Sequence, residues 1–388
     1  MPEPHVIQHT HQRMTPPARN WWAKVSAVAG LVGAAIVCGG WLFFAMVFPE
    51  TGWDFSQFYI TAGLPIESIY DRAAFESRGV EQLAPLGVDY FPPYVRPAVF
   101  SLPLGPLAFL SYTHALWLFA GIQFLFLCIV LFLLNRRFGL PCEMIPAFML
   151  CYPAMMGIIT GQDPHTLLLL VLSGFLLLEK GRDILAGCTL ALCLYKFNLI
   201  LWLPLLLLAR RRWTALGSFC AAGVALAAAS ALLAPPGDYL RLLANIEQYT
   251  IAFTPESMIG FRALSVTLGW EPLYFLVSPV LVAVGFPLLR NRPLPEAYML
   301  AIIGSMLCSY HVNWYDGALL LIPIALVRER GSAPAQMLGS VLLAVFPLWV
   351  YRPVIASMVA LLWVLIAWKT PRSSEAVLAP SPASVSTG

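Results

Sequence analysis

The sequence predicts an all-α protein that crosses a membrane about twelve times. Of its 388 residues, 59% are hydrophobic and only 11% are charged, and the mean hydropathy is +0.76. A soluble chain of this length cannot bury so much apolar surface, so much of that surface must face lipid. The net charge of +3 is too small to indicate binding to nucleic acid. The 8 cysteines form no CxxC pair, so neither a disulfide framework nor a thiolate metal site is indicated.

The expected helices are apolar runs that cross, or nearly cross, a hydrocarbon core of roughly 30 Å. They cover residues 24–48, 97–134, 143–160, 164–179, 184–195, 197–209, 213–234, 270–289, 295–310, 316–327, 334–350 and 353–368. The run 97–134 contains Pro97, Pro103 and Pro106, which predict a surface-lying or kinked first part before one crossing. We therefore expect one transmembrane domain over residues 24–369. A cytoplasmic tail, 1–23, precedes it, and a disordered cytoplasmic tail, 370–388, follows it.

The two short runs 184–195 and 197–209 decide the topology, because they could form either one helix or two. With the amino terminus in the cytoplasm and two crossings, most of the 23 Lys and Arg residues lie on the inner side. Fusing the runs divides the basic residues almost evenly and leaves Lys196 inside the membrane. The positive-inside rule thus favours two crossings. With an even number of crossings, both termini are then cytoplasmic, and we expect a multi-pass protein of the plasma (inner) membrane.

The first outer loop, residues 49–96, follows the first apolar run and carries Asp54 near its start. Loops of this length are commonly functional, and Phe55–Tyr59 and Ala73–Arg78 read as short amphipathic helices with their aromatic rings toward lipid. A carboxylate at this position could deprotonate a hydroxyl beside a lipid-borne substrate. The structural alternative is that Asp54 caps the helix that follows it.

In this topology the other unusual polar clusters also reach the outer face. Gln162 and Asp163 lie in a tight connection between two helices. Gly161 would end the first helix and Asp163 would cap the second, while Gln162 could hydrogen-bond a sugar. Lys196 would meet lipid phosphates there, either by nonspecific snorkelling or by recognising one phosphate beside Tyr195 and Asn198.

A late cluster runs from His311 through Asn313 to Asp316. Aromatic residues within it also suit ordinary interfacial anchors, whereas a His, an amide and a carboxylate within six residues favour a substrate site. His311 could carry a proton or donate a hydrogen bond near pH 7. Arg262, in the loop 235–269, is a weaker candidate.

The order and sidedness of these pieces resemble glycosyltransferase family 87, within the GT-C class of multi-spanning enzymes. The resembling pieces run from Trp53-Asp54-Phe55-x-x-Phe58-Tyr59 and Ile69-Tyr70-Asp71 through Phe91-Pro92-Pro93-Tyr94, Gly161-Gln162 and Tyr195-Lys196 to His311 and Tyr315-Asp316. Asp163 and His165 depart from the small or amide residues expected after Gly161-Gln162.

The resemblance implies a GT-C bundle of about 12 helices, with the active site outside the cell. The reaction implied is inverting transfer of a hexose, with mannose as the expected sugar, from a polyprenyl-phosphate sugar to a lipid or glycan acceptor of the cell envelope. Asp54 would be the general base. Lys196, with Arg262 or Arg96 behind it, would meet the leaving phosphate. His311 would bind donor phosphate or sugar, and the remaining donor-binding residues implied are Gln162, Asn313, Asp316 and Tyr59.

The resemblance also implies no cofactor and no metal. From the residues alone, Asp54, Asp163, His311 and Asp316 could converge on a divalent ion. Expected partners are the lipid-linked donor, the acceptor and membrane lipids, without nucleic acid. A polytopic transporter or flippase is the main alternative, because about twelve spans are usual for transporters. A noncatalytic envelope scaffold is the third.

Overall fold

The computed structural model describes residues 54–140, 144–249, 258–344 and 352–368, and within them the regular structure is helical apart from one isolated bridge between Met258 and Asn313. The expected first span, 24–48, and the expected tails, 1–23 and 370–388, lie outside the described residues.

The helices follow the apolar runs closely. In chain order they are α2 (Ser56–Gly63), η1 (Ile66–Ser68), α3 (Arg72–Gln82), η2 (Ala84–Leu86), η3 (Ala98–Phe109), α4 (Tyr112–Phe138), α5 (Ile145–Met149), α6 (Tyr152–Ile159), α7 (Pro164–Glu179), α8 (Asp183–Ala191), η5 (Leu192–Leu199), α9 (Trp202–Ala209), α10 (Trp213–Leu233), α11 (Pro236–Ala244), α12 (Ile246–Tyr249), α13 (Phe261–Thr267), α14 (Pro272–Asn291), α15 (Leu294–Cys308), η8 (Trp314–Leu320), α16 (Leu321–Arg330), α17 (Ala333–Ala344) and α18 (Arg352–Trp368). As expected from its prolines, the run 97–134 divides into η3 and α4.

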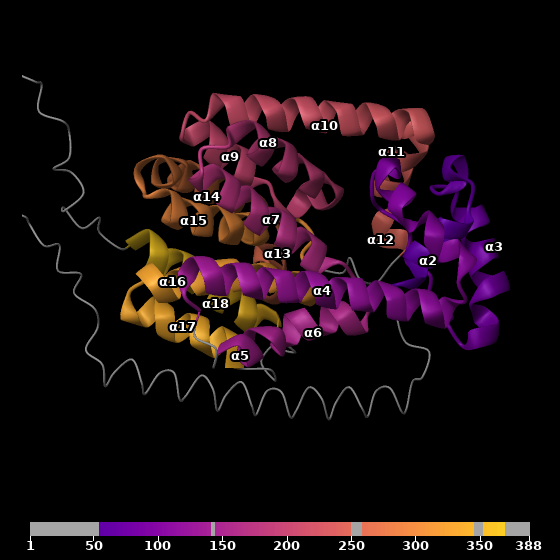
Figure 1. Cartoon of the computed structure of the whole chain (residues 1–388), viewed down its shortest axis with the longest axis horizontal. Coiled ribbons are helices and arrows are strands. Elements are labelled where there is room, and N and C mark those ends of the chain that lie inside the picture. The colour runs from indigo at the N-terminus through magenta and orange to yellow at the C-terminus, as the bar shows by residue number, and fades with distance from the viewer. Residues whose placement is uncertain (1–53, 141–143, 250–257, 345–351, 369–388) are drawn as a thin grey trace, which may run out of the picture.

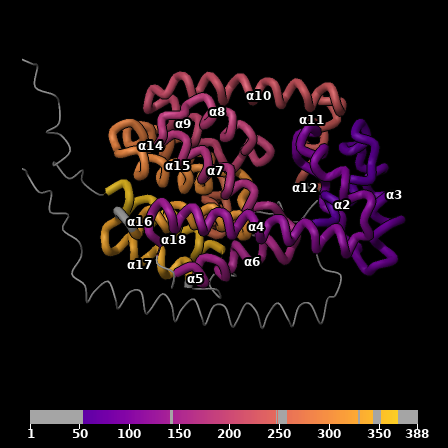
Figure 2. The backbone as a smooth tube through the Cα atoms, viewed as in Figure 1, coloured from indigo at the N-terminus to yellow at the C-terminus, as the bar shows by residue number. Residues whose placement is uncertain are grey.

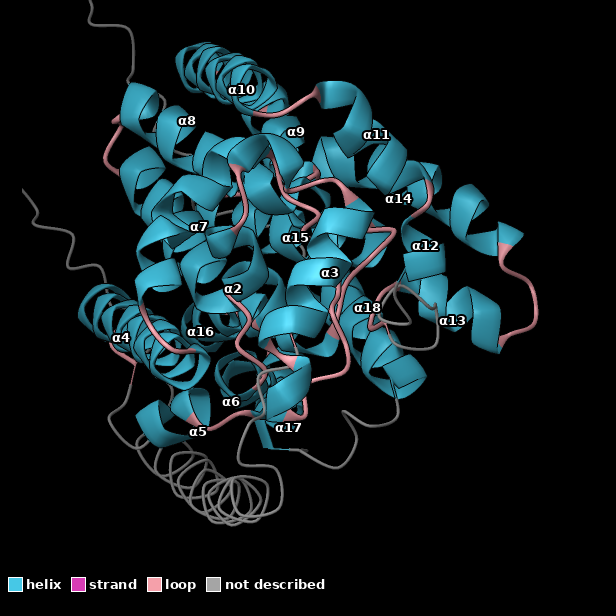
Figure 3. Cartoon of the chain, turned by 90° about the vertical axis from the view of Figure 1, so that its right-hand side faces the viewer, coloured by secondary structure: helices cyan, strands magenta, loops and turns pink. Residues whose placement is uncertain are grey.

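Among the described residues, α4, α10 and α14 are long and apolar enough to cross a membrane, and shorter apolar helices pack beside them. The protein is therefore an all-helical membrane protein. Figure 1 and the tube in Figure 2 show α10 running along the top edge of the bundle and α4 crossing its middle, with α2, α3, α11 and α12 gathered at one end. Seen from that end, α2 and α3 lie in front of the bundle (Figure 3).

The chain reverses at Lys196. Its backbone there is non-helical, with φ −125° and ψ 55°, between α8 and α9. An ion pair of 3.0 Å joins Arg212, just after α9, to Asp183 at the start of α8. Since the end of α9 thus returns to the beginning of α8, the runs 184–195 and 197–209 form two antiparallel helices rather than one. The division into two segments agrees with the prediction from the basic residues, while two membrane crossings stay a prediction.

Ion pairs and carbonyl contacts tie several helix ends together at the end of the bundle away from Lys196. Arg137 of α4 binds Glu179 of α7 at 2.9 Å, and Arg210 donates to the carbonyl oxygen of Arg292, after α14, at 2.6 Å. Together with Arg212 and Asp183, these contacts gather the basic connections at one end. The polar connections before α7, within η5 and before η8 therefore lie at the opposite end of the bundle.

The first outer loop contains the helices expected in it, but its aromatic rings do not face lipid. Phe55, Phe58 and Phe75 are fully or almost fully buried, and they belong to a core that includes Tyr94 and Phe119. The expectation of outward-facing rings is wrong because the rings pack against η3 and α4. This packing makes the loop a folded cap on the bundle, and Asp54 stands at the beginning of that cap.

Candidate functional site

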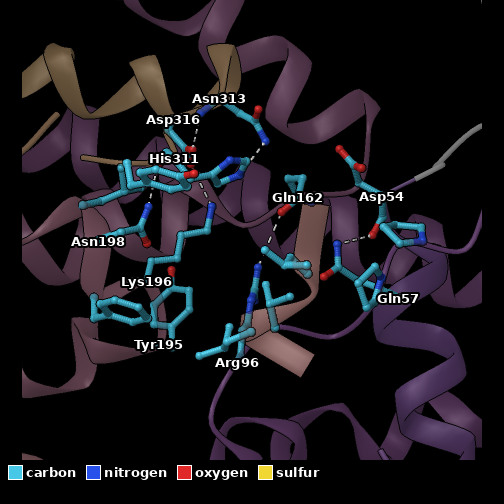
Figure 4. A pocket seen from close by; sticks show the side chains of 18 of the residues that line it. Asp54, Gln57, Arg96, Gln162, Tyr195, Lys196, Asn198, His311, Asn313 and Asp316 are labelled. Carbon is cyan, nitrogen blue, oxygen red and sulfur yellow. Dashed lines mark hydrogen bonds and ion pairs between the residues drawn. The ribbon is translucent and has the colours of Figure 1, made fainter. Parts of the chain in front are cut away.

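A cavity of about 290 Å³ lies between the folded first loop and the bundle. Asp54 and Gln57 line it from the start of α2, and Arg96 lines it from the segment before η3. On the bundle side the polar lining consists of Gln162, Lys196, Asn198, His311, Asn313 and Asp316. Figure 4 shows Asp54 beside Gln162 on one side of the cavity, with Lys196, Asn198, His311 and Asp316 on the other side. Six of the eight site residues expected from the sequence thus meet around one space.

Gly161 brings Asp54 to the cavity. It follows α6 with a φ of +70°, a conformation that favours glycine, so the expectation that it ends this helix is confirmed. A Cβ atom on Gly161 would lie 2.4 Å from the Cβ atom of Phe55. The absence of a side chain therefore lets the start of α2 approach the connection that carries Gln162.

Asp54 does not cap α2. The N-cap residue is Phe55, and it makes no side-chain cap bond. Burial raises the pKa of Asp54 to about 6, although the hydrogen bond with Gln162 and the charges of Lys196 and Arg96 oppose the rise. A carboxylate with this pKa is ionised at neutral pH, yet it is more basic than an ordinary aspartate. A raised pKa of this size is common among carboxylates that act as general bases.

Four charged side chains alternate in sign along one wall. Arg96 donates to both carboxylate oxygens of Asp163, and the second of these bonds measures 2.7 Å. Lys196 lies 3.3 Å from the same carboxylate and 2.8 Å from that of Asp316. Lys196 is therefore held between two specific carboxylates, which nonspecific snorkelling does not require.

Asp163 occupies the N-cap position of α7, as the sequence predicts, but its side chain makes no cap bond. It binds the two cations instead. Burial would raise its pKa, but Arg96 and Lys196 outweigh that effect and hold the pKa of Asp163 below its ordinary value. Its carboxylate is thus ionised at neutral pH.

Hydrogen bonds connect the residues of the late cluster, from His311 through Asn313 to Asp316, with one another. The backbone nitrogen of Asn313 donates to Asp316 at 2.9 Å, and the amide of Asn313 lies 3.3 Å from Nε2 of His311. Asn198 donates to the carbonyl oxygen of His311. Burial, with Lys196 and Arg262 nearby, lowers the pKa of His311 to about 3. The imidazole is therefore uncharged near pH 7, and hydrogen bonding is available to it, while a role as a proton carrier stays a prediction.

Arg262 and Tyr59 lie outside the cavity lining. Arg262 is buried, pairs with Glu271 at 2.9 Å and stacks 3.7 Å over the ring of Tyr310, which does line the cavity. Tyr59 donates to the carbonyl oxygen of Leu110 at 2.9 Å and packs against Tyr112.

Sequence reasoning gave too little weight to Arg96 and overlooked Gln57. Arg96 is 8% exposed, and its guanidinium lies 4.3 Å from the ring centre of Phe58 and 5.1 Å from that of Tyr195. The available signal was an arginine at the end of the loop 49–96, directly before a proline-rich apolar run, because an arginine that becomes buried there needs a carboxylate partner. The side chain of Gln57 binds the backbone oxygen of Asp54 at 2.9 Å, and spacing alone did not reveal this contact.

The described residues contain no group of three or more His, Cys, Asp or Glu side chains arranged to hold a metal ion. Asp163 and Asp316 instead face Arg96 and Lys196.

A family model for glycosyltransferase family 87 matches residues 94–310, more than half of the chain. The chain belongs to glycosyltransferase family 87. It is therefore a glycosyltransferase, with a sugar donor and an acceptor as its substrates. The matched segment of this family 87 enzyme contains Arg96, Gln162 and Lys196, while Asp54 precedes it and the cluster from His311 onward follows it. No curated protein and no solved structure matches the chain significantly.

Proposed function

We propose that this family 87 enzyme transfers a hexose, with mannose the first candidate, from a polyprenyl-phosphate sugar to a hydroxyl of a lipid or glycan acceptor. The observation that carries the proposal is the placement of Asp54 opposite the cations Arg96 and Lys196 across one cavity (Figure 4). Glycosyl transfer from a phosphate requires a base on the acceptor side and positive charge on the leaving-group side. Both are present, facing the same space.

In the proposed reaction, the acceptor hydroxyl gives its proton to Asp54 as its oxygen attacks the anomeric carbon. The bond from that carbon to the phosphate oxygen breaks, and the lipid phosphate leaves with the electron pair. Attack from the side opposite the phosphate inverts the anomeric centre. Arg96 and Lys196 stabilise the charge that develops on the leaving oxygen.

Hydrogen-bonding groups between Asp54 and the two cations would hold the sugar. Gln162 and Asn313 present amides, His311 presents a neutral imidazole, and Asp316 presents a carboxylate already turned toward Lys196. We assign Arg262 and Tyr59 a supporting place behind the lining. Arg262 stacks on Tyr310, and Tyr59 anchors α2 to the segment before α4.

We further propose that residues 24–369 form one GT-C type domain of about 12 membrane helices in the plasma (inner) membrane. Its first outer loop and active site would be extracytoplasmic, and both termini cytoplasmic. The separation of polar connections from basic ones supports this orientation, because basic connections favour the cytoplasmic side. A flipped lipid-linked sugar is available outside the cell, whereas nucleotide sugars are not.

The decisive experiment is transfer by the purified enzyme in detergent, without a membrane gradient. Radiolabelled polyprenyl-phosphate mannose is supplied with envelope lipid or glycan acceptors, and polyprenyl-phosphate glucose serves as the alternative donor. Labelled acceptor with inverted anomeric configuration is the expected product. Transfer from a nucleotide sugar but from neither lipid donor would overturn the donor assignment. Because detergent removes the gradient, observed transfer also excludes the transporter alternative as the explanation.

A further inference from the structure

Asp163 differs from the other charged residues of the wall because it does not line the cavity. It is 5% exposed and lies behind Arg96 and Lys196, both of which do line the cavity. One of its oxygens, Oδ1, accepts from Arg96 at 2.7 Å and faces Lys196 at 3.3 Å. The two cations are thus held close together by a buried carboxylate that does not itself line the cavity.

Each cation also has a support of its own. The guanidinium of Arg96 lies between the rings of Phe58 and Tyr195, and Lys196 is bound by Asp316. When Asp163 is neutralised, Asp316 still binds Lys196, and an Asn or Ser at position 163 can still accept a hydrogen bond from Arg96. The main change in the cavity is the loss of one negative charge behind them.

In the proposed reaction, the negative charge of Asp163 would affect how tightly the phosphate groups of donor and product bind. The donor is a phosphodiester with one negative charge, whereas the product is a phosphomonoester with about −1.5 to −2 at pH 7. Two cations without buried counterions would therefore bind the product more tightly than the donor, and the product would leave slowly. A carboxylate behind the cations weakens phosphate binding by repulsion.

We propose that Asp163 is a positioning counterion: it holds Arg96 and Lys196 in front of it and offsets their charge so that the lipid-phosphate product can leave. This inference rests on the proposed function, since it needs a phosphate at Arg96 and Lys196. Asp163 acts only through these two side chains.

The test uses the purified full chain and farnesyl phosphate, a short isoprenyl phosphomonoester, as the probe. Asp163→Asn and Asp163→Ser both remove the charge, and both residues suit the N-cap position that Asp163 occupies. Asp163→Glu keeps the charge. Asp183→Asn is the matched control, because Asp183 pairs with Arg212 at the opposite end of the bundle.

We expect both neutral variants to bind farnesyl phosphate about tenfold more tightly than wild type, as removal of one nearby buried charge implies. Their kcat and KM for transfer should fall together, because slow product release lowers both. The acidic limb of kcat/KM should move to lower pH, because Arg96 and Lys196 then act more strongly on Asp54. A purely structural role would lower stability without these three changes.

Wild-type or weaker binding of farnesyl phosphate by both neutral variants would overturn the proposal, as would equally tight binding by Asp183→Asn. If the wild-type enzyme binds no farnesyl phosphate, the phosphate site itself is refuted, and the role of Asp163 with it. If it binds the probe but transfers no sugar, the transfer chemistry fails, while the comparison of binding still decides the role of Asp163.

Discussion

Replacement of Asp54 by Asn separates the chemistry of this carboxylate from its packing. The amide has nearly the same shape but cannot accept the acceptor's proton, so kcat should fall by roughly 10²–10⁴. Because burial raises the pKa of Asp54 to about 6, kcat/KM of the wild type should increase with pH up to about 6 and level off above it. Asp54→Asn should lose this acidic limb.

The same substitution should stabilise the folded protein at neutral pH. The pKa of Asp54 is higher in the folded protein, about 6, than the ordinary value of 3.8 expected in the unfolded chain. The folded protein therefore loses stability as the pH rises from 3.8 through about 6, because the carboxylate must ionise while buried. The amide of Asp54→Asn does not ionise, so this variant should be more stable than the wild type by ~1–3 kcal/mol at pH 7.5. The difference should shrink at pH 5 and disappear near pH 3.

Transfer kinetics and thermal unfolding in detergent measure both effects. The control is Asp89→Asn, which removes an exposed acid from the same loop. Asp89→Asn should match the wild type in both measurements. Retention of more than a tenth of the wild-type kcat by Asp54→Asn, or an unchanged acidic limb, would refute the assignment of Asp54 as the base.

Three further predictions concern the surroundings of Asp54. Lys196→Met should lower kcat/KM by roughly 10²–10³, because it removes a cation at the leaving phosphate. Lys196→Arg should recover part of this activity, and equal activities of the two variants in the transfer assay would contradict the assignment. Gly161→Ala should lower kcat/KM and the melting temperature together, because the new Cβ atom meets Phe55 and the φ of +70° is strained; unchanged kinetics would show that the approach of α2 is not needed. His311→Gln should reduce transfer but leave the acidic limb near pH 6, because a group with a pKa of about 3 does not titrate there; a displaced limb would assign that pKa to His311 instead.

The helical segments were predictable because each depends on a local property of the sequence. Pro103 and Pro106 predicted the irregular helix before α4, and Gly161 predicted the end of α6. The distribution of Lys and Arg resolved the reversal at Lys196, since charges near the membrane depend on sidedness and not on packing detail. The gathering of Gln162, Lys196 and Asp316 at one end followed from that topology.

The partners of these groups were not predictable. The same Asp-Pro pair describes a capping aspartate or a buried counterion, and only the approach of Arg96, 67 residues away in the chain, decides between them. The rings of Phe55 and Phe58 suit a lipid-facing helix equally well, but α4 and η3 bury them.

The sequence by itself thus determined an all-helical membrane protein, its reversal at Lys196 and the set of polar residues on one side. Hydropathy, proline and basic residues act locally and suffice for these features. Only the tertiary structure decided that burial raises the pKa of Asp54 and lowers that of His311, and that Asp163 lies behind two cations. Burial and charge pairing depend on segments far apart in the chain, and their effects exist only once those segments meet.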